Sequence, residues 1–426
     1  MKDTSLLVEH FFRHESGRLV AVLARLFGLR HLDLVEDMVQ AALLDALQSW
    51  KLKGVPENPS AWIHAVARRK VLDSLRHRET VLRLAPSFAR LRPDFSEQEL
   101  NDHFLDSAIE DAQLRMMFAC CHPSLSREDQ IALALKALCG FGHAEIARAL
   151  LVSEETIKKR LQRAKRELVA NGVELAVPPA SELPARLDSV HQCLYLLFNE
   201  GYAATTGDAA IRNDLCAEAV RLCDLLCSQP QCRGPASHAL LALMFFHAAR
   251  FDSRVDTDGR LLLLEEQDRS KWNPTLIGRA TYCLNRSAEG ERVSTYHLEA
   301  GIAMLHCSAP SFAETDWPGI LRLYDVLVRI APSPVVNLNR AVAVAQIQGP
   351  SAGIRLIEEQ AEGLKDYPLA DAVLGELHRR AGDHDRALGH LRAALARTRS
   401  EPDRELLRAR ISKCESLDGT SRRGTI

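Results

Sequence analysis

The chain has 426 residues, which is too many for one ordinary hydrophobic core and predicts two to four domains. Its 54 Lys and Arg nearly balance its 56 Asp and Glu, so the net charge of −2 excludes a globally basic nucleic-acid binder. The N-terminus lacks the apolar core of a secretory signal, and the most apolar window, residues 239–249, is too short to span a bilayer. The eleven cysteines are therefore expected to be reduced thiols of a cytoplasmic protein.

Apolar residues recur at spacings of three and four along nearly the whole chain, and strand-like alternation is almost absent. This periodicity predicts an all-α protein. Changes in composition divide it into two small helical domains, 1–80 and 112–172, an acidic linker, 81–111, a second linker, 173–186, a helical domain, 187–300, and a repeat-like helical array, 301–426.

The first domain contains a predicted amphipathic helix over residues 32–50, whose polar face carries Asp33, Asp37 and Gln40. A loop over 51–60 separates it from a second predicted helix, "AWIHAVARRKVLDSLRHRE". Residues 64–83 hold six basic and two acidic side chains, but these charges surround the helix instead of forming a stripe. The pattern alone is thus weak evidence for phosphate binding. Trp50 and Trp62 are interpreted as core residues.

Residues 94–111 contain seven acidic residues and no Lys or Arg. Such a segment avoids DNA, and it suits either a basic channel or solvent. The two interpretations remain open.

The stretch "SEETIKKRLQRAKREL", residues 153–168, places apolar residues on one face of a helix and basic residues on the other. Ser153 is the predicted N-cap. The preceding "GHAEIARAL" and "LVS" predict a short helix and a tight turn, so the three segments form a helix-turn-helix, whose second helix reads the major groove. A solvated surface helix is the alternative, and the helix predicted over "REDQIALALKALCGFG" favours a compact, DNA-binding bundle.

Small and apolar residues near the C-terminus recur as in tetratricopeptide repeats. The last unit carries Leu374, Gly375, Ala387, Leu391 and Ala394, and the preceding units carry Ala352 and Leu356, and Tyr324, Leu327 and Pro332. These degenerate repeats predict an array of helix pairs in which each pair buries its apolar face against its neighbours.

Several segments of the chain resemble those of a known family. "VEDMVQAALLDALQSW" and "AWIHAVARRKVLDSLRHR" are similar to the polymerase-binding and promoter-melting helices of extracytoplasmic-function sigma factors. "IALALKALCGFGHAEIARALLVSEETIKKRLQRAKREL" is similar to the promoter-binding module of that family. The remainder, with "LYLLFNEGYAATTGD", "VDTDGRLLLLEEQDRSKW" and "TDWPGILRLYDVL", resembles the C-terminal helical extension of one sigma-factor group.

The resemblance implies core RNA polymerase and promoter DNA as partners, with no enzymatic activity, no cofactor, no metal and no membrane. It implies that the linker threads toward the RNA path of the polymerase, and that the extension contacts the promoter-reading modules or the polymerase. The residues implied to bind polymerase are Asp37 and Gln40. Those implied to bind the single-stranded downstream (−10) element are Asn58, Arg68, Arg69, Lys70, Arg76 and Arg78, with Arg69 standing where many relatives have Asn. Those implied to face the double-stranded upstream (−35) element are Lys158, Lys159, Gln162, Arg163 and Arg166.

Other motifs favour structural roles. "RVDTDGRLLLLEE" resembles a calcium loop, but Arg254 stands at the first ligand position. The cysteines around Cys223 and Cys227 match no short zinc-knuckle spacing, and "CCHP" at 120–123 is interpreted as core packing.

The sequence therefore predicts a sigma factor whose helical extension regulates it. Two alternatives remain: a helix-turn-helix regulator with a repeat-type sensor domain, which would bind an operator without polymerase, and an enzyme with its site around Glu200 and Asp256. The segment with Asp37 and Gln40 disfavours the first alternative, since a simple repressor does not need it. The lack of a nucleophile–base pair or metal constellation disfavours the second.

Overall fold

The computed structural model describes residues 2–82, 106–150, 152–202, 212–257, 260–290, 292–365, 367–398 and 400–421. These residues form helices and one isolated bridge, between Val255 and Leu261. The all-α prediction is confirmed. The chain divides into two compact units, Met1–Leu196 and Leu197–Ile426, and the boundary lies within helix α9 (Leu183–Tyr202).

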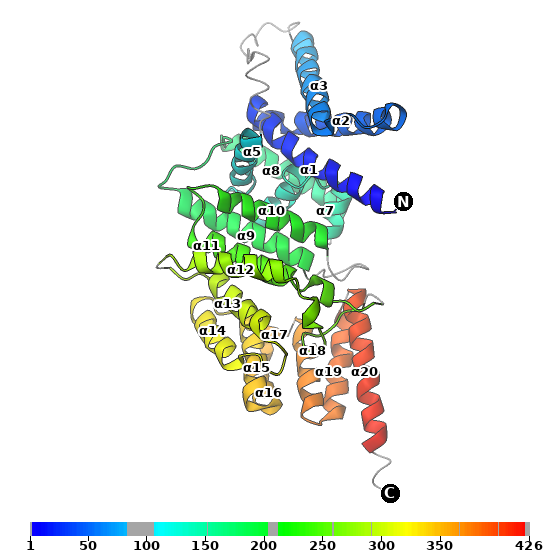
Figure 1. Cartoon of the computed structure of the whole chain (residues 1–426), viewed down its shortest axis with the longest axis vertical. Coiled ribbons are helices and arrows are strands. Elements are labelled where there is room, and N and C mark those ends of the chain that lie inside the picture. The colour runs from blue at the N-terminus through cyan, green and yellow to red at the C-terminus, as the bar shows by residue number, and fades with distance from the viewer. Residues whose placement is uncertain are drawn as a thin grey trace. The chain divides into compact units, whose positions relative to one another are not determined.

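The described residues of the first unit form three long helices, a group of shorter ones and the first part of α9 (Figure 1). The long helices are α1 (Lys2–Phe27), α2 (Leu32–Lys53), which follows the single turn η1 (Leu29–His31), and α3 (Pro59–Leu82). The shorter helices are α5 (Asp106–Cys120), α6 (Arg127–Ala137), α7 (His143–Ala149) and α8 (Glu154–Ala170). Helices α6, α7 and α8 form the predicted helix-turn-helix bundle.

Helix α1 packs against both groups, since it contacts α2 and α3 as well as α5 and α6. Two glycines permit the close approach. A Cβ at Gly17 would lie 2.0 Å from the carbonyl oxygen of Leu138, and a Cβ at Gly140 would lie 2.4 Å from that of Arg13. Gly140 also has a φ of +69°, which side-chain-bearing residues rarely adopt. Any larger residue at either glycine would force the backbones apart.

The structure begins α5 at Asp106, inside the stretch expected to be a linker, and residues 94–105 lie outside the described residues. Asp111 binds Arg25 of α1 at 2.5 Å and Arg115 at 2.9 Å. At least this acid of the segment is therefore neutralised within the protein.

The second unit is also helical. Its elements are α10 (Asn213–Ser228), α11 (Pro235–Ala248), η2 (Phe251–Ser253), η3 (Arg269–Lys271), α12 (Pro274–Ser287), α13 (Thr295–Ser308), α14 (Trp317–Ile330), α15 (Pro334–Gln348), α16 (Pro350–Glu358), α17 (Ala361–Leu364), α18 (Pro368–Arg380), α19 (His384–Arg397) and α20 (Glu401–Ser421).

Consecutive helices of this unit pack as neighbours from α13 to α16 and from α18 to α20, where α18, α19 and α20 lie side by side (Figure 1). Small residues set the spacing within pairs. A Cβ at Gly375 of α18 would lie 2.7 Å from Leu391 of α19, and one at Gly353 of α16 would lie 2.7 Å from Ala345 of α15. The helix pairs thus approach as the sequence predicted, while the tetratricopeptide class stays a prediction.

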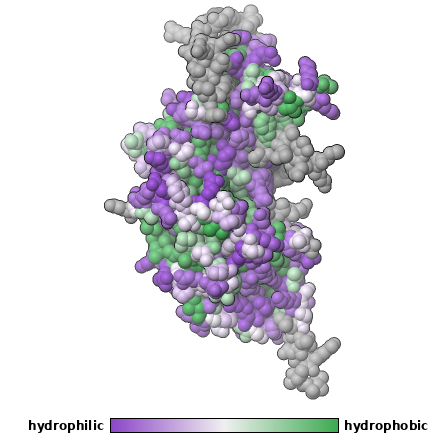
Figure 2. Space-filling view, viewed as in Figure 1, coloured by the Kyte–Doolittle hydropathy of each residue, from purple (hydrophilic) through white to green (hydrophobic). Residues whose placement is uncertain are grey.

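Hydrophilic residues occupy much of the surface visible in Figure 2, with apolar ones between them. Among the described residues, no helix combines the length and the hydropathy that a membrane span requires.

Candidate nucleic-acid interface

Helix α8 has a buried apolar face and an exposed basic face. Ser153 caps its N-terminus as predicted, since Ser153 Oγ accepts a hydrogen bond from Thr156 N at 3.1 Å. The apolar stripe is buried as predicted, in Ile157, Leu161, Ala164 and Leu168. Because this stripe packs against the bundle, α8 is held in one orientation, with its basic face toward solvent.

Two lysines dominate the first turns of that face. The Lys158 and Lys159 side chains are 52% and 73% exposed, and they pair with Glu154 at 3.1 Å and Glu155 at 3.4 Å. Ion pairs of this exposed kind within one helix contribute only about 0.3–0.5 kcal/mol. Both ammonium groups can therefore exchange a glutamate for a phosphate at little cost. Two further predicted contacts, Gln162 and Arg166, are also exposed.

Arg163 has an internal partner that the sequence did not reveal. Its Nε donates to Asp129 Oδ2 at 2.8 Å, and its Nη2 donates to Asp129 Oδ1 at 2.6 Å. The Asp129 side chain is 1% exposed, whereas that of Arg163 is half exposed. Hydrogen bonds to this carboxylate raise the pKa of Arg163. The bidentate pair ties α8 to α6, and the guanine contact of Arg163 stays a prediction.

Lys165, on another face of α8, joins the helix-turn-helix bundle to α2. Its Nζ lies 2.6 Å from Asp33 Oδ1 and 2.8 Å from Glu36 Oε2, and its side chain is 11% exposed. Burial raises the pKa of Glu36. Burial by itself would lower the pKa of Lys165, but the charges and hydrogen bonds of Glu36 and Asp33 raise it. This lysine is thus held as a cation inside the first unit and is not displayed to solvent.

The basic residues predicted on α3 are placed unequally. Arg69 is exposed and Arg68 is half-buried. Lys70 binds Asp45 of α2 at 2.8 Å, and Arg76 is exposed beside Asp73 at 3.4 Å. The side chain of Arg78 lies outside the described ones.

Asn58 caps the helix that carries these residues. Its Oδ1 accepts a hydrogen bond from Ala61 N at 3.0 Å, and the side chain remains exposed in the loop before α3. The cap fixes the position of the loop relative to the basic helix. The role of Asn58 toward a flipped base stays a prediction.

An exposed stripe follows the outer side of α2. Asp37 and Gln40 are exposed on it, and they are followed by Leu44 and Leu47, whose residues are 58% and 47% exposed. The spacing of three and four places all of these residues on one helical face. The two leucines were not predicted as functional residues, although continuation of the Asp37–Gln40 spacing would have found them.

Three families match successive parts of the chain. Sigma-70 region 2 matches residues 11–80, sigma-70 region 4 matches residues 115–168, and a family of unknown function, DUF6596, matches residues 186–288. An uncharacterized protein of Rhizobium meliloti (strain 1021) is 37% identical over 371 residues, which cover 86% of this chain and 86% of that relative. The chain belongs to the sigma-70 family. Its two sigma-70 regions and its C-terminal DUF6596 domain are those of an extracytoplasmic-function-like sigma factor with an extension.

The exposed surfaces of α2, α3 and α8 lie within the two sigma-70 regions. Region 2 includes α2, α3 and the loop between them, and region 4 includes α6, α7 and α8. These regions support a role in promoter recognition and binding to core RNA polymerase and promoter DNA in general.

The calcium-like loop and the cysteines of "CCHP" make contacts within the protein or are buried in it. Arg254 of the calcium-like loop donates to the carbonyl oxygen of Tyr202 at 2.6 Å and lies over its ring, while Asp258 and Gly259 lie outside the described residues. Cys120 and Cys121 are buried. The described residues contain no group of three or more His, Cys, Asp or Glu that could hold a metal ion.

Proposed function

We propose that the exposed stripe of α2 binds core RNA polymerase, that α8 reads the upstream duplex, and that α3 with its preceding loop holds the melted downstream strand. The stripe comprises Asp37, Gln40, Leu44 and Leu47. The proposal gives each of these three surfaces one partner.

The observation that carries the proposal is the composition of the α2 stripe. A carboxylate and an amide are followed on the same face by two large apolar side chains that the protein leaves in water. A docking surface needs both kinds, because apolar contacts supply affinity while polar groups set orientation. A helix-turn-helix repressor gains nothing from exposing these leucines on a helix outside its DNA-binding bundle.

The basic side chains of α8 and α3 support the two DNA contacts. Lys158 and Lys159 are exposed on a capped helix, as phosphate or base contacts in a groove must be. Arg69 and Arg76 are exposed on a helix whose entry loop carries Asn58. Exposed cations along a single strand would neutralise its phosphates.

We also propose that the extension regulates the sigma-70 regions. Its residues from Leu197 onward form a compact unit with its own buried core. This unit contains no part of either sigma-70 match, so it is the part of the chain available for a regulatory role.

Binding to core polymerase tests the α2 assignment. The double variant Asp37→Ala/Gln40→Ala should weaken binding of the full chain to purified core enzyme about tenfold or more, as expected for central interface residues. Fluorescence anisotropy of the labelled chain would measure this affinity. Asp188→Ala/Gln192→Ala is the matched control, because it removes an exposed acid–glutamine pair from α9.

Run-off transcription from promoters selected on genomic DNA gives the second measurement. The α2 variant should lose transcripts while it keeps duplex binding through α8. Equal core affinity for the variant, the control and the unchanged chain would refute the α2 assignment. Operator binding with no polymerase dependence at all would favour the repressor alternative.

A further inference from the structure

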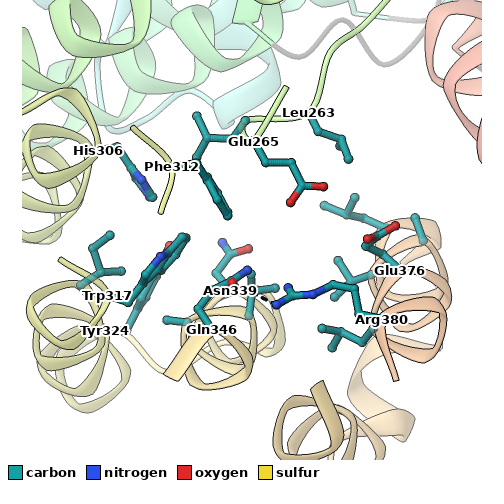
Figure 3. Close-up of a pocket in the computed structure, with 18 of the residues that line it drawn as sticks. Leu263, Glu265, His306, Phe312, Trp317, Tyr324, Asn339, Gln346, Glu376 and Arg380 are labelled. Carbon is teal, nitrogen blue, oxygen red and sulfur yellow. Dashed lines mark hydrogen bonds between the residues drawn. The ribbon is translucent and has the colours of Figure 1, made fainter. Parts of the chain in front are cut away.

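The second unit contains a cavity of about 300 Å³ that the sigma-factor assignment does not use. Residues of α13, α14, α15, α18 and α20 line it, together with the segment Leu263, Leu264 and Glu265 (Figure 3). The volume falls at the lower end of the range for small-molecule sites, about 300–1,000 Å³. A ligand there would be a single small molecule.

One end of the cavity is aromatic. Figure 3 shows His306, Phe312, Trp317 and Tyr324 on the same side. The ring of Trp317 lies 5.3 Å from the ring of Phe312 and 5.3 Å from that of His306. Burial raises the pKa of Tyr324 and lowers that of His306 to about 3, so both rings are neutral at pH 7. This wall favours a flat apolar group.

The other side of the cavity carries the guanidinium of Arg380, an exposed residue. Arg380 donates from Nη2 to Gln346 Oε1 at 3.1 Å, and Figure 3 shows this bond together with Asn339 and Glu376 nearby. A guanidinium has five N–H donors, so several remain for a ligand. Planar carboxylates match this arrangement of donors.

The charged groups that line the cavity balance one another in number. The cavity is lined by two arginines, Arg380 and Arg410, and by two glutamates, Glu265 and Glu376. Glu376 already accepts hydrogen bonds from Arg379 at 2.6 Å and 3.1 Å. The charge of Arg410 is offset by Glu265 and Glu266, and among the described residues no acidic side chain pairs with Arg380, so its guanidinium is available to an anion.

Hydrogen bonds from Arg269 hold part of the aromatic wall in place. Arg269 donates from Nη1 to the carbonyl oxygens of His306 at 2.6 Å and Ala309 at 2.7 Å. It also donates from Nη2 to Thr315 Oγ1 at 3.2 Å. These bonds fix the segment that carries Phe312 into the aromatic wall.

The residues just before Arg269 also line the cavity. Leu263 N donates to Glu266 Oε2 at 2.9 Å, and Gln267 Nε2 donates to the carbonyl oxygen of Leu262 at 3.2 Å. The stretch "LLLLEEQDR", noted in the sequence as part of an extension motif, thus places Leu263 and Glu265 at the cavity and Arg269 behind it.

We propose that this cavity binds a small aromatic carboxylate. The ring would lie against Trp317 and Tyr324, and the carboxylate would accept two hydrogen bonds from Arg380. The proposal concerns binding alone, so it stands or falls independently of the assignments in the sigma-70 regions.

A matched set of probes tests it on the full chain. The probes are naphthoate, indoleacetate and phenylpropanoate, each compared by isothermal titration calorimetry with its neutral carboxamide. At least one carboxylate should bind with one-to-one stoichiometry and more tightly than its amide. Arg380→Gln should weaken carboxylate binding about tenfold or more and leave amide binding unchanged.

Two controls separate the site from a general effect. Arg355→Gln removes an exposed arginine of α16 outside the cavity and should leave all affinities unchanged. Circular dichroism and thermal unfolding would show that Arg380→Gln remains folded. Trp317→Phe should weaken carboxylate and amide alike, because it alters only the aromatic wall.

The proposal is overturned if no carboxylate of the set binds more tightly than its amide. It is equally overturned if Arg380→Gln and Arg355→Gln change carboxylate affinity to the same extent, because the guanidinium would then not hold the anion.

Discussion

The Arg163 guanidinium binds both carboxylate oxygens of Asp129, whose side chain is 1% exposed. A side chain in this position stabilises the bundle whether or not it also reaches DNA. Replacement by alanine would leave the Asp129 carboxylate buried without the cation that binds it. The effect of Arg163 on DNA binding therefore has to be separated from its effect on folding.

Arg163→Ala should lower the free energy of unfolding by about 1–3 kcal/mol, which is the usual cost of an unsatisfied buried group. Urea denaturation would measure it. Arg166→Ala, which removes an exposed arginine of the same helix, should change stability by less. Arg163→Ala/Asp129→Ala should recover part of the loss in a double-mutant cycle. Equal stability of the two single variants would contradict an important role for the pair.

At the scale of the element, α8 divides its cations between two tasks. Arg163 and Lys165 bind acidic side chains of α6 and α2, whereas Lys158 and Lys159 face solvent beside glutamates of their own helix. Only the second pair can transfer to phosphates without loss of a tertiary contact.

Lys158→Ala/Lys159→Ala should therefore weaken binding to upstream-element duplex without lowering stability. Each phosphate contact in B-DNA contributes about 0.9 to the slope of log K against log salt, so the slope should fall by about 2. Fluorescence anisotropy over a salt series would measure it. Lys271→Ala/Lys365→Ala, in the second unit, is the charge-matched control. An unchanged slope would show that these lysines do not contact phosphate.

How much the sequence predicts also differs by element. The cap at Ser153 and the buried stripe of α8 follow from local spacing, and both were predicted. The pairs Arg163–Asp129 and Lys165–Glu36 join residues 34 and 129 positions apart, so no local pattern contains them. The same holds for the cavity around Arg380, whose walls come from several helices and a loop. Periodicity predicts which face of a helix is buried, but it does not predict which residues of other helices pack against that face.

At the scale of the molecule, the contacts within the first unit constrain how a promoter can be read. Lys165 of the region 4 match binds Asp33 of the region 2 match, and Arg13 of region 2 binds Glu145 of region 4 at 2.7 Å. The −35 and −10 elements are roughly 25 base pairs apart, or about 85 Å at 3.4 Å per base pair. Under the proposed assignment of α8 to the upstream element and α3 to the downstream strand, modules in direct contact would not reach both elements, so the proposal requires the two regions to separate on the promoter.

Zero-length cross-linking would detect this separation. A carbodiimide joins a carboxylate to an amine in contact with it, and the Asp33 carboxylate is 82% exposed and lies 2.6 Å from Lys165 Nζ. The Asp33–Lys165 amide should therefore form in the protein alone, and its yield, measured by mass spectrometry of peptides, should fall when core polymerase and promoter DNA are added. The internal control is the Lys70–Asp45 pair, at 2.8 Å between α3 and α2 of one region, whose yield should not change. A constant ratio of the two amides across both conditions would mean that the sigma-70 regions stay together on the promoter, and the assignment of α8 to the upstream element and α3 to the downstream strand of the same DNA would then be wrong.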